Sequence, residues 1–117
     1  MPGDDNTDRE RLNELMADHD EFFSRFGALD DSVYGDGAIP KLYKELTGLS
    51  ISVATNCNEC VMYHIEGALD ADADRAQLIE AIKIGVIGRG SVTYPTARFA
   101  FSVLEERGIL EGDSPTS

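Results

Sequence analysis

The sequence has few basic residues, few cysteines and no long hydrophobic run, and each shortage excludes a class of protein. Only 10 lysines and arginines stand against 22 aspartates and glutamates, which leaves a formal net charge of -12 at pH 7. Such an acidic surface repels phosphate backbones and anionic lipids, so neither nucleic acids nor membrane surfaces are expected partners. No segment approaches the roughly 18–20 apolar residues that a membrane-spanning helix requires.

The N-terminus lacks the basic start and the apolar stretch of a secretion signal, which predicts a cytoplasmic protein. Lysine is scarce, with 3 lysines against 7 arginines, and 12 aspartates exceed 10 glutamates. Short acidic side chains and few lysine stems keep a surface hydrated in salt, which also screens carboxylate repulsion. This balance favours a salt-adapted cytoplasm, although an acidic protein from any other cell fits it too.

The rest of the composition predicts a single domain over residues 1–117 with an all-α fold of about five to six helices. A hydrophobic fraction of 42% and a charged fraction of 27% suit one packed core. Polar tails are expected at residues 1–6 and 111–117. Short strands over residues 82–87 and 91–94 are the alternative, which is disfavoured because hairpin turn signals are lacking.

The expected helices follow from apolar spacing and from capping residues. Thr7 and Glu10 form a capping box for a first helix over about residues 8–26, which Gly27 is expected to end. The other four expected helices cover residues 40–53, opened by Pro40; 57–69; 75–87, capped by Asp74 and Gln77; and 93–107, opened by Thr93 and Pro95. Gly48 and Gly67, inside two of these helices, are expected to mark close helix contacts.

The two cysteines are Cys57 and Cys60, and His64 follows one turn later. At about 100° per residue, the three side chains fall within about 60° of one another on a helix face. If the helix begins near Cys57, free amide N–H groups and the helix dipole stabilise a thiolate there. His64 is then placed to take or relay the proton of Cys60.

Three interpretations of this cluster remain. Two buried cysteines and a core histidine would be structural only. Alternatively, Cys57, Cys60 and His64 would be three of four zinc ligands in a non-catalytic oligomeric module, with a carboxylate or a neighbouring subunit completing the site. Dithiol–disulfide redox chemistry is favoured, because a reducing compartment makes a single Cys-x-x-Cys pair more typical of this use than of a structural cross-link.

The same region resembles a known protein family. Glu45, eleven residues, Cys57-x-x-Cys60, three residues and His64 are similar to the signature of the carboxymuconolactone decarboxylase/alkylhydroperoxidase D-like proteins. The resemblance covers about residues 40–105. It implies an all-helical fold with the cysteine pair at a helix N-terminus, and a homo-oligomer, with a hexamer favoured over a trimer.

The resemblance also implies roles for four residues. Cys60 would attack an organic hydroperoxide or a protein disulfide, and Cys57 would close a disulfide on it. Glu45 and His64, with a bridging water, would relay the proton that activates Cys60. The implied enzyme is an antioxidant peroxidase or disulfide reductase that needs no metal, haem or flavin and draws electrons from an unknown dithiol donor.

One departure from the family pattern qualifies this expectation, and the intact cysteine pair bears on a second activity of the family. Some peroxidase members carry a histidine immediately before the second cysteine, whereas this chain has Glu59, whose charge tends to raise the pKa of the neighbouring thiol. The branch that acts on a lactone as a lyase or isomerase does not depend on a cysteine pair, and the intact pair argues against that activity. Asp70, Asp72 and Asp74 resemble the start of a calcium loop, but Arg75 and Ala81 occupy positions that require Gly and Glu.

The sequence gives its own reason to expect assembly. The segment 79–87 carries apolar side chains around most of a helix: Ile79, Ile82, Ile84, Val86 and Ile87. A helix that is apolar all round must be buried on all sides, and a five-helix monomer offers little cover. Partner subunits are therefore expected to bury the remainder.

Overall fold

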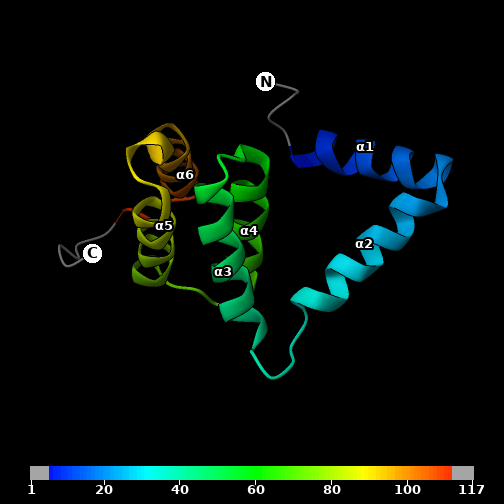
Figure 1. Cartoon of the computed structure of the whole chain (residues 1–117), viewed down its shortest axis with the longest axis horizontal. Helices are drawn as coiled ribbons and strands as arrows, with labels where there is room; N and C mark the ends of the chain where they lie inside the picture. Colours follow the sequence, from blue (N-terminus) through cyan, green and yellow to red (C-terminus); the bar gives the residue numbers. More distant parts are fainter. Residues whose placement is uncertain (1–5, 112–117) are drawn as a thin grey trace. The chain divides into compact units, whose positions relative to one another are not determined.

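The computed structural model describes residues 6–111 (Figure 1). These residues form six α-helices and a short 3-10 helix with no strand among them, so the all-α prediction is confirmed. The strand alternative for residues 82–87 and 91–94 is wrong. No helix within residues 6–111 has the length and apolar character needed to cross a membrane. The chain divides into two compact units, with the boundary between Gly35 and Asp36.

The first unit corrects the expected N-terminal helix. Two helices, α1 (Asn6–His19) and α2 (Glu21–Tyr34), replace the single helix predicted for residues 8–26. Asp20 has extended backbone angles, and its carboxylate accepts a hydrogen bond from the Phe22 N–H at 2.9 Å, so it ends one helix and caps the next. The prediction that Thr7 caps this helix is wrong, because α1 already begins at Asn6 and Thr7 lies inside it. Most of the two polar tails lie outside the described residues.

Gly27 does not end a helix, contrary to the prediction. It lies inside α2, which continues to Tyr34 and ends at Gly35. A glycine inside a helix costs only about 1 kcal/mol relative to alanine, and seven further helical residues offset that cost. None of the residues of α2 is buried.

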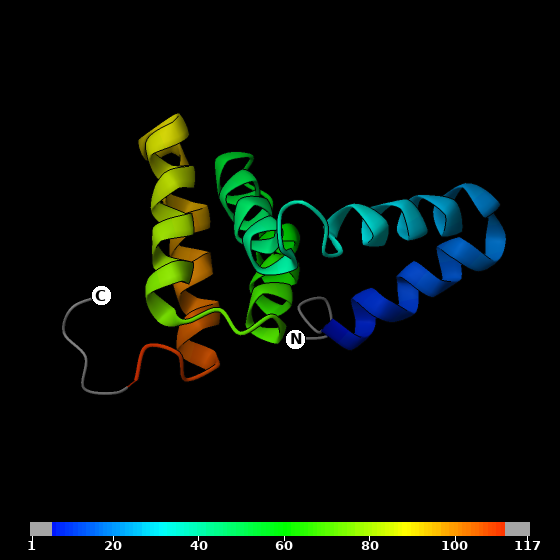
Figure 2. The ribbon, with the colours of Figure 1, turned by 90° about the horizontal axis from the view of Figure 1, so that it is seen from below.

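The second unit contains the remaining helices: α3 (Lys41–Ala54), α4 (Asn58–Asp70), α5 (Arg75–Arg89), η2 (Ser91–Thr93) and α6 (Tyr94–Glu106). α3 packs against both α4 and α5. α6 contacts α4, and it lies beside α5 (Figures 1 and 2). The four helices therefore enclose one core, and α3 contributes to it through its contacts with both α4 and α5.

Local signals place most of these boundaries where the sequence predicts them. The capping box of Asp74 and Gln77 is present at the start of α5, and Gly90, with φ of 88°, follows its end. Pro40 precedes α3 as its N-cap and is not its first residue, a shift of one position. Cys57 is likewise the N-cap of α4.

The core is aliphatic and draws on all four helices. Its buried residues are Leu49, Val53, Val61, Ile65, Ala68, Leu78, Ala81, Ile82, Ala100, Val103 and Leu104. Gly85 permits the close approach of α5 to α3, because a Cβ atom at this position would lie 2.6 Å from the Ser50 carbonyl oxygen and 2.7 Å from the Val53 Cβ. The contact of α3 with α5 therefore depends on the absence of a side chain at Gly85.

We expect Gly85→Ala to lower the free energy of unfolding by about 1–3 kcal/mol, because the added methyl group forces α5 away from α3. Gly88→Ala on the same helix is the matched control, since nothing lies within 4 Å of a Cβ atom there. The control should be neutral or stabilising by up to about 1 kcal/mol. Chemical denaturation followed by circular dichroism measures both, and equal stability of the two variants would contradict this account of the α3–α5 contact.

Candidate active site

The turn between α3 and α4 is held by local and by long-range hydrogen bonds. Asn56 adopts a left-handed conformation with φ of 56°, which asparagine tolerates better than most residues. Its side-chain oxygen accepts a hydrogen bond from the Thr96 hydroxyl of α6 at 2.8 Å, and the Cys57 N–H donates to the Ser52 carbonyl at 3.0 Å. The residue before the first cysteine is thereby anchored to the core unit.

Cys57 and Cys60 are joined by a disulfide, with their Cα atoms 5.3 Å apart. Cys57, at the N-cap of α4, is half-buried, and its sulfur accepts a hydrogen bond from the Cys60 N–H at 3.2 Å. Cys60 lies in the first turn and is exposed. Amide N–H groups of a first turn favour negative charge, so the position suits a thiolate once the disulfide is reduced.

Glu45 of α3 and His64 of α4 form a buried pair. The Nδ1 atom of His64 lies 2.8 Å from Oε1 of Glu45, and the two residues are 8% and 2% exposed. An ionised carboxylate only accepts hydrogen bonds, so Nδ1 carries the proton in this contact. The second ring nitrogen, Nε2, is then the basic one when the ring is neutral.

Two glycines make room for this pair. A Cβ atom at Gly48 of α3 would lie 2.6–2.8 Å from three atoms of the His64 ring, and one at Gly67 of α4 would lie 2.5–2.8 Å from the Glu45 carboxyl group. Each of these two side chains therefore occupies the space opposite a glycine of the other helix. The prediction that Gly48 and Gly67 mark close contacts is confirmed, with the addition that these contacts are to His64 and Glu45.

The structure brings the four predicted residues together as two pairs. The disulfide joins Cys57 and Cys60, and a hydrogen bond joins Glu45 and His64. Both pairs meet on α4, where Cys60 and His64 are four residues apart and hence neighbours on the helix surface. Tyr63 packs edge-on against the His64 ring, with centroids 5.1 Å apart.

The sequence reasoning missed Lys41. Its Nζ lies 2.7 Å from Oε2 of Glu45, so both oxygens of that carboxylate have a partner. The signal was available, because a lysine and a glutamate four residues apart on a predicted helix are expected to pair. Within residues 6–111, no group of three or more His, Cys, Asp or Glu side chains is arranged to hold a metal ion.

Comparison with known proteins identifies a family model and several relatives of this chain. The family model for the carboxymuconolactone decarboxylase family matches residues 20–106, a longer stretch than the expected 40–105. An uncharacterized protein of the cox locus of Paracoccus denitrificans is 35% identical over 81 residues, which cover 69% of this chain and 73% of that protein. A second uncharacterized protein, from Cupriavidus necator, is 32% identical over 81 residues, which cover 69% of each chain.

Solved structures of the same family share the fold. A Thermotoga maritima member superposes with a TM-score of 0.79 at 33% identity and covers 85% of each chain. A Legionella pneumophila member gives a TM-score of 0.75 at 26% identity and covers 84% of this chain and 88% of its own. The extent of the family match, the helical fold and the Cys57–Cys60 pair together show that this chain belongs to the carboxymuconolactone decarboxylase family.

Proposed function

We propose that this protein is a thiol oxidoreductase that reduces organic hydroperoxides or protein disulfides by cycling Cys57 and Cys60 between dithiol and disulfide. The observation that carries the proposal is the buried Glu45–His64 pair, whose histidine lies on α4 one turn after the exposed Cys60. A histidine oriented by a carboxylate is a general base, and a thiol one helix turn away is its natural proton donor.

In the proposed peroxide cycle, the two thiols of this chain reduce one hydroperoxide, and one external dithiol then reduces the disulfide that forms. His64 takes the proton of the Cys60 thiol, and the thiolate attacks one oxygen of the hydroperoxide and breaks the O–O bond. The departing alkoxide takes up the proton and leaves as an alcohol, while Cys60 becomes a sulfenic acid. The Cys57 thiol then displaces water from that sulfur to form the disulfide, which a dithiol donor reduces again.

The environment of the cysteines supports the assignment of Cys60 as the attacking sulfur. Cys60 is exposed, whereas Cys57 is half-buried at the N-cap. A hollow of about 490 Å³ adjoins the same turn and offers room for a substrate; it is lined by Asn56, Asn58, Val92, Pro95 and Thr96. Asn56 and Asn58 are the sequence neighbours of Cys57, so the hollow adjoins the segment that carries the first cysteine.

The relatives support a redox role without specifying it. The family includes enzymes, and a role in an antioxidative response is named as a possibility for the Thermotoga maritima member. The exposed Glu59 places a negative charge next to Cys60, which disfavours the thiolate. Because attack on a disulfide also needs the thiolate, Glu59 should slow both reactions and leave the order of the steps unchanged.

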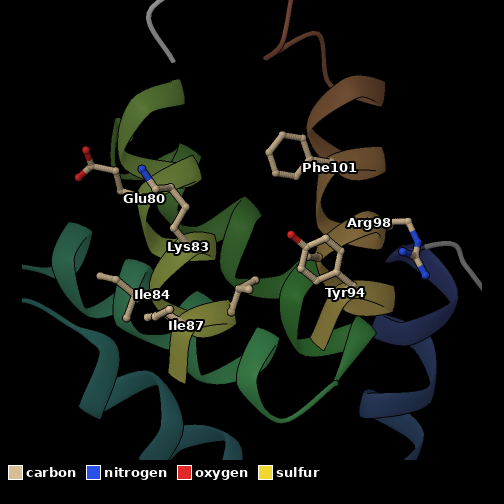
Figure 3. A pocket seen from close by; sticks show the side chains of 9 residues that line it. Glu80, Lys83, Ile84, Ile87, Tyr94, Arg98 and Phe101 are labelled. Atoms are coloured by element: carbon tan, nitrogen blue, oxygen red, sulfur yellow. The ribbon is translucent and has the colours of Figure 1, made fainter. Parts of the chain in front are cut away.

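We further propose that the chain assembles as a homo-oligomer, with a hexamer favoured and a trimer second. A groove of about 770 Å³ lies between α5 and α6, where Ile84, Ile87, Tyr94 and Phe101 are exposed (Figure 3). Glu80, Lys83 and Arg98 also line this groove, so charges of both signs surround its apolar side chains. A second copy of this chain would bury the exposed apolar side chains, and we assign it as the occupant.

The first prediction from this proposal concerns the two sulfurs. Cys60→Ser should abolish turnover while fold and assembly persist, because the attacking thiol is gone. Cys57→Ser should stall after the first step, with a sulfenic acid or mixed disulfide on Cys60. Mass spectrometry after one equivalent of hydroperoxide identifies the modified sulfur. Stable oxidation on Cys57 alone would reverse the assignment.

The second prediction concerns the proton relay. Glu45→Gln and His64→Asn should each slow attack by the thiol near neutral pH by about 10²- to 10⁴-fold, the usual scale of general acid–base catalysis. The loss should shrink at high pH, where the Cys60 thiol ionises without help. Stopped-flow rates across pH measure this, with His19→Asn as the control because His19 is an exposed histidine on α1. A loss that is the same at every pH would indicate a packing role instead.

The third prediction concerns assembly. The oligomer should persist at molar salt and weaken at low ionic strength, because the Debye length grows from about 3 Å at 1 M to about 30 Å at 0.01 M. Ile87→Asp should dissociate it, since Ile87 is 83% exposed in the α5–α6 groove. Ala76→Asp adds the same charge to an exposed site on α5 outside the groove and is the control. Light scattering that shows a monomer at molar salt would contradict the assembly, and an oligomer indifferent to salt would contradict its electrostatic part.

A further inference from the structure

Glu45 is a buried carboxylate that has a partner on each oxygen. Its side chain is 2% exposed, Oε1 accepts a hydrogen bond from His64 Nδ1 at 2.8 Å, and Oε2 accepts one from Lys41 Nζ at 2.7 Å. The Lys41 side chain is 40% exposed, so its ammonium group reaches the carboxylate from the edge of the site. Three ionisable groups therefore form one chain from the solvent side to the imidazole ring.

Building on the proposed function, we propose that Lys41 is a positioning residue of the proton relay. Its ammonium group keeps Glu45 ionised while the His64 ring is neutral, so that the ring is available to accept the Cys60 proton. Lys41 touches neither sulfur in this scheme and acts only through Glu45.

The charges of the three groups support this role. A carboxylate removed from water must be balanced by a nearby cation or be protonated itself. With Lys41 in place, the pair Lys41–Glu45 is already neutral, and His64 need not carry a charge in the resting site. Without Lys41, a second proton on His64 is the least costly way to balance the charge of the buried Glu45 carboxylate. A histidine that already holds this proton cannot accept one from the thiol.

The position of Lys41 is determined by the helix. Lys41 and Glu45 are one turn apart on α3, which brings their side chains onto the same face. The Lys41 backbone N–H donates to Oδ1 of Asp36 at 2.7 Å, which anchors the first residue of the helix. This hydrogen bond fixes the backbone of Lys41, and the Lys41 side chain extends along one helix turn to Oε2 of Glu45.

Several other charged groups of α4 and α5 are exposed or have partners of their own. Glu66 of α4 pairs with Arg107, which follows α6. Glu80 and Lys83 of α5 are exposed and line the α5–α6 groove. Glu59 is exposed in the first turn of α4, and Tyr63 contributes its ring edge to His64. Lys41 is thus the cation placed against Glu45, and its removal should be felt at His64.

The test is a titration of the His64 ring by proton NMR, carried out on the disulfide form so that no thiol titrates alongside. In Lys41→Met, His64 should keep its proton to higher pH, with the midpoint raised by about one pH unit or more, because a nearby cation no longer opposes protonation. Lys41→Arg should restore the wild-type midpoint. Arg25→Met, which removes an exposed cation paired with Glu21 on α2, should leave the midpoint unchanged. The chain has two histidines, and His19→Asn identifies the His64 signal.

A midpoint that moves by less than about 0.3 pH units in Lys41→Met would overturn the inference. It would mean that the Lys41–Glu45 ion pair has as little effect on His64 as an ordinary exposed ion pair. If Lys41→Met does not fold, Lys41→Gln, which keeps a hydrogen-bond donor and removes the charge, is titrated with the same two outcomes. The titration needs no substrate. A raised midpoint in a protein without hydroperoxide or disulfide turnover would therefore contradict the proposed function alone, and normal turnover with an unmoved midpoint would contradict the role of Lys41 alone.

Discussion

The contact between Glu45 and His64 is the constraint on which the site and much of the core depend. A carboxylate that is 2% exposed is costly unless its oxygens are paired, so α3 and α4 must meet at the register that brings His64 to it. That approach requires the two glycines, Gly48 and Gly67, opposite the two side chains. The apolar contacts of the same helices, Leu49 and Val53 with Val61 and Ile65, stabilise the same register. Hydrophobic packing and polar pairing therefore support one arrangement of the two helices.

The remaining helices complete the core and leave one face open. α5 approaches α3 at Gly85, where a carbonyl oxygen and a valine occupy the space that a side chain would need. α6 reaches across to the turn before Cys57 through the Thr96–Asn56 hydrogen bond. Between α5 and α6 the apolar surface is not covered, and Ile84 and Ile87 stay exposed. The unit is thus well packed where α3 meets α4 and α5, and it leaves apolar side chains exposed between α5 and α6.

The balance of charge differs between the surface of this protein and its candidate site. The chain has 22 acidic residues and only 3 lysines, yet one of these lysines is placed against the buried carboxylate of the site. On the surface, an acidic excess aids hydration and is screened by salt. Inside the site, salt screens the charges less. The attraction between Lys41 and Glu45 therefore affects the site more than the net charge of the chain does. The net charge of the chain therefore describes its surface, while local pairing determines which groups contact the Glu45 carboxylate.

Features that depend on neighbours along the chain could be predicted from the sequence. The spacing of Cys57, Cys60 and His64, the capping box of Asp74 and Gln77, and the all-helical class all follow from contacts within one or two turns. The Glu45–His64 pairing, over 19 residues, was expected only from the family resemblance, and the seating of these side chains against Gly67 and Gly48 required the packed helices. Local reasoning failed where two signals competed: Gly27 looked like a helix end, but Asp20, with its carboxylate on the Phe22 N–H, is where the chain breaks. Only the tertiary structure decided which face of α5 is buried, because Ile82 and Ile87 have the same hydrophobicity and differ only in what packs against them.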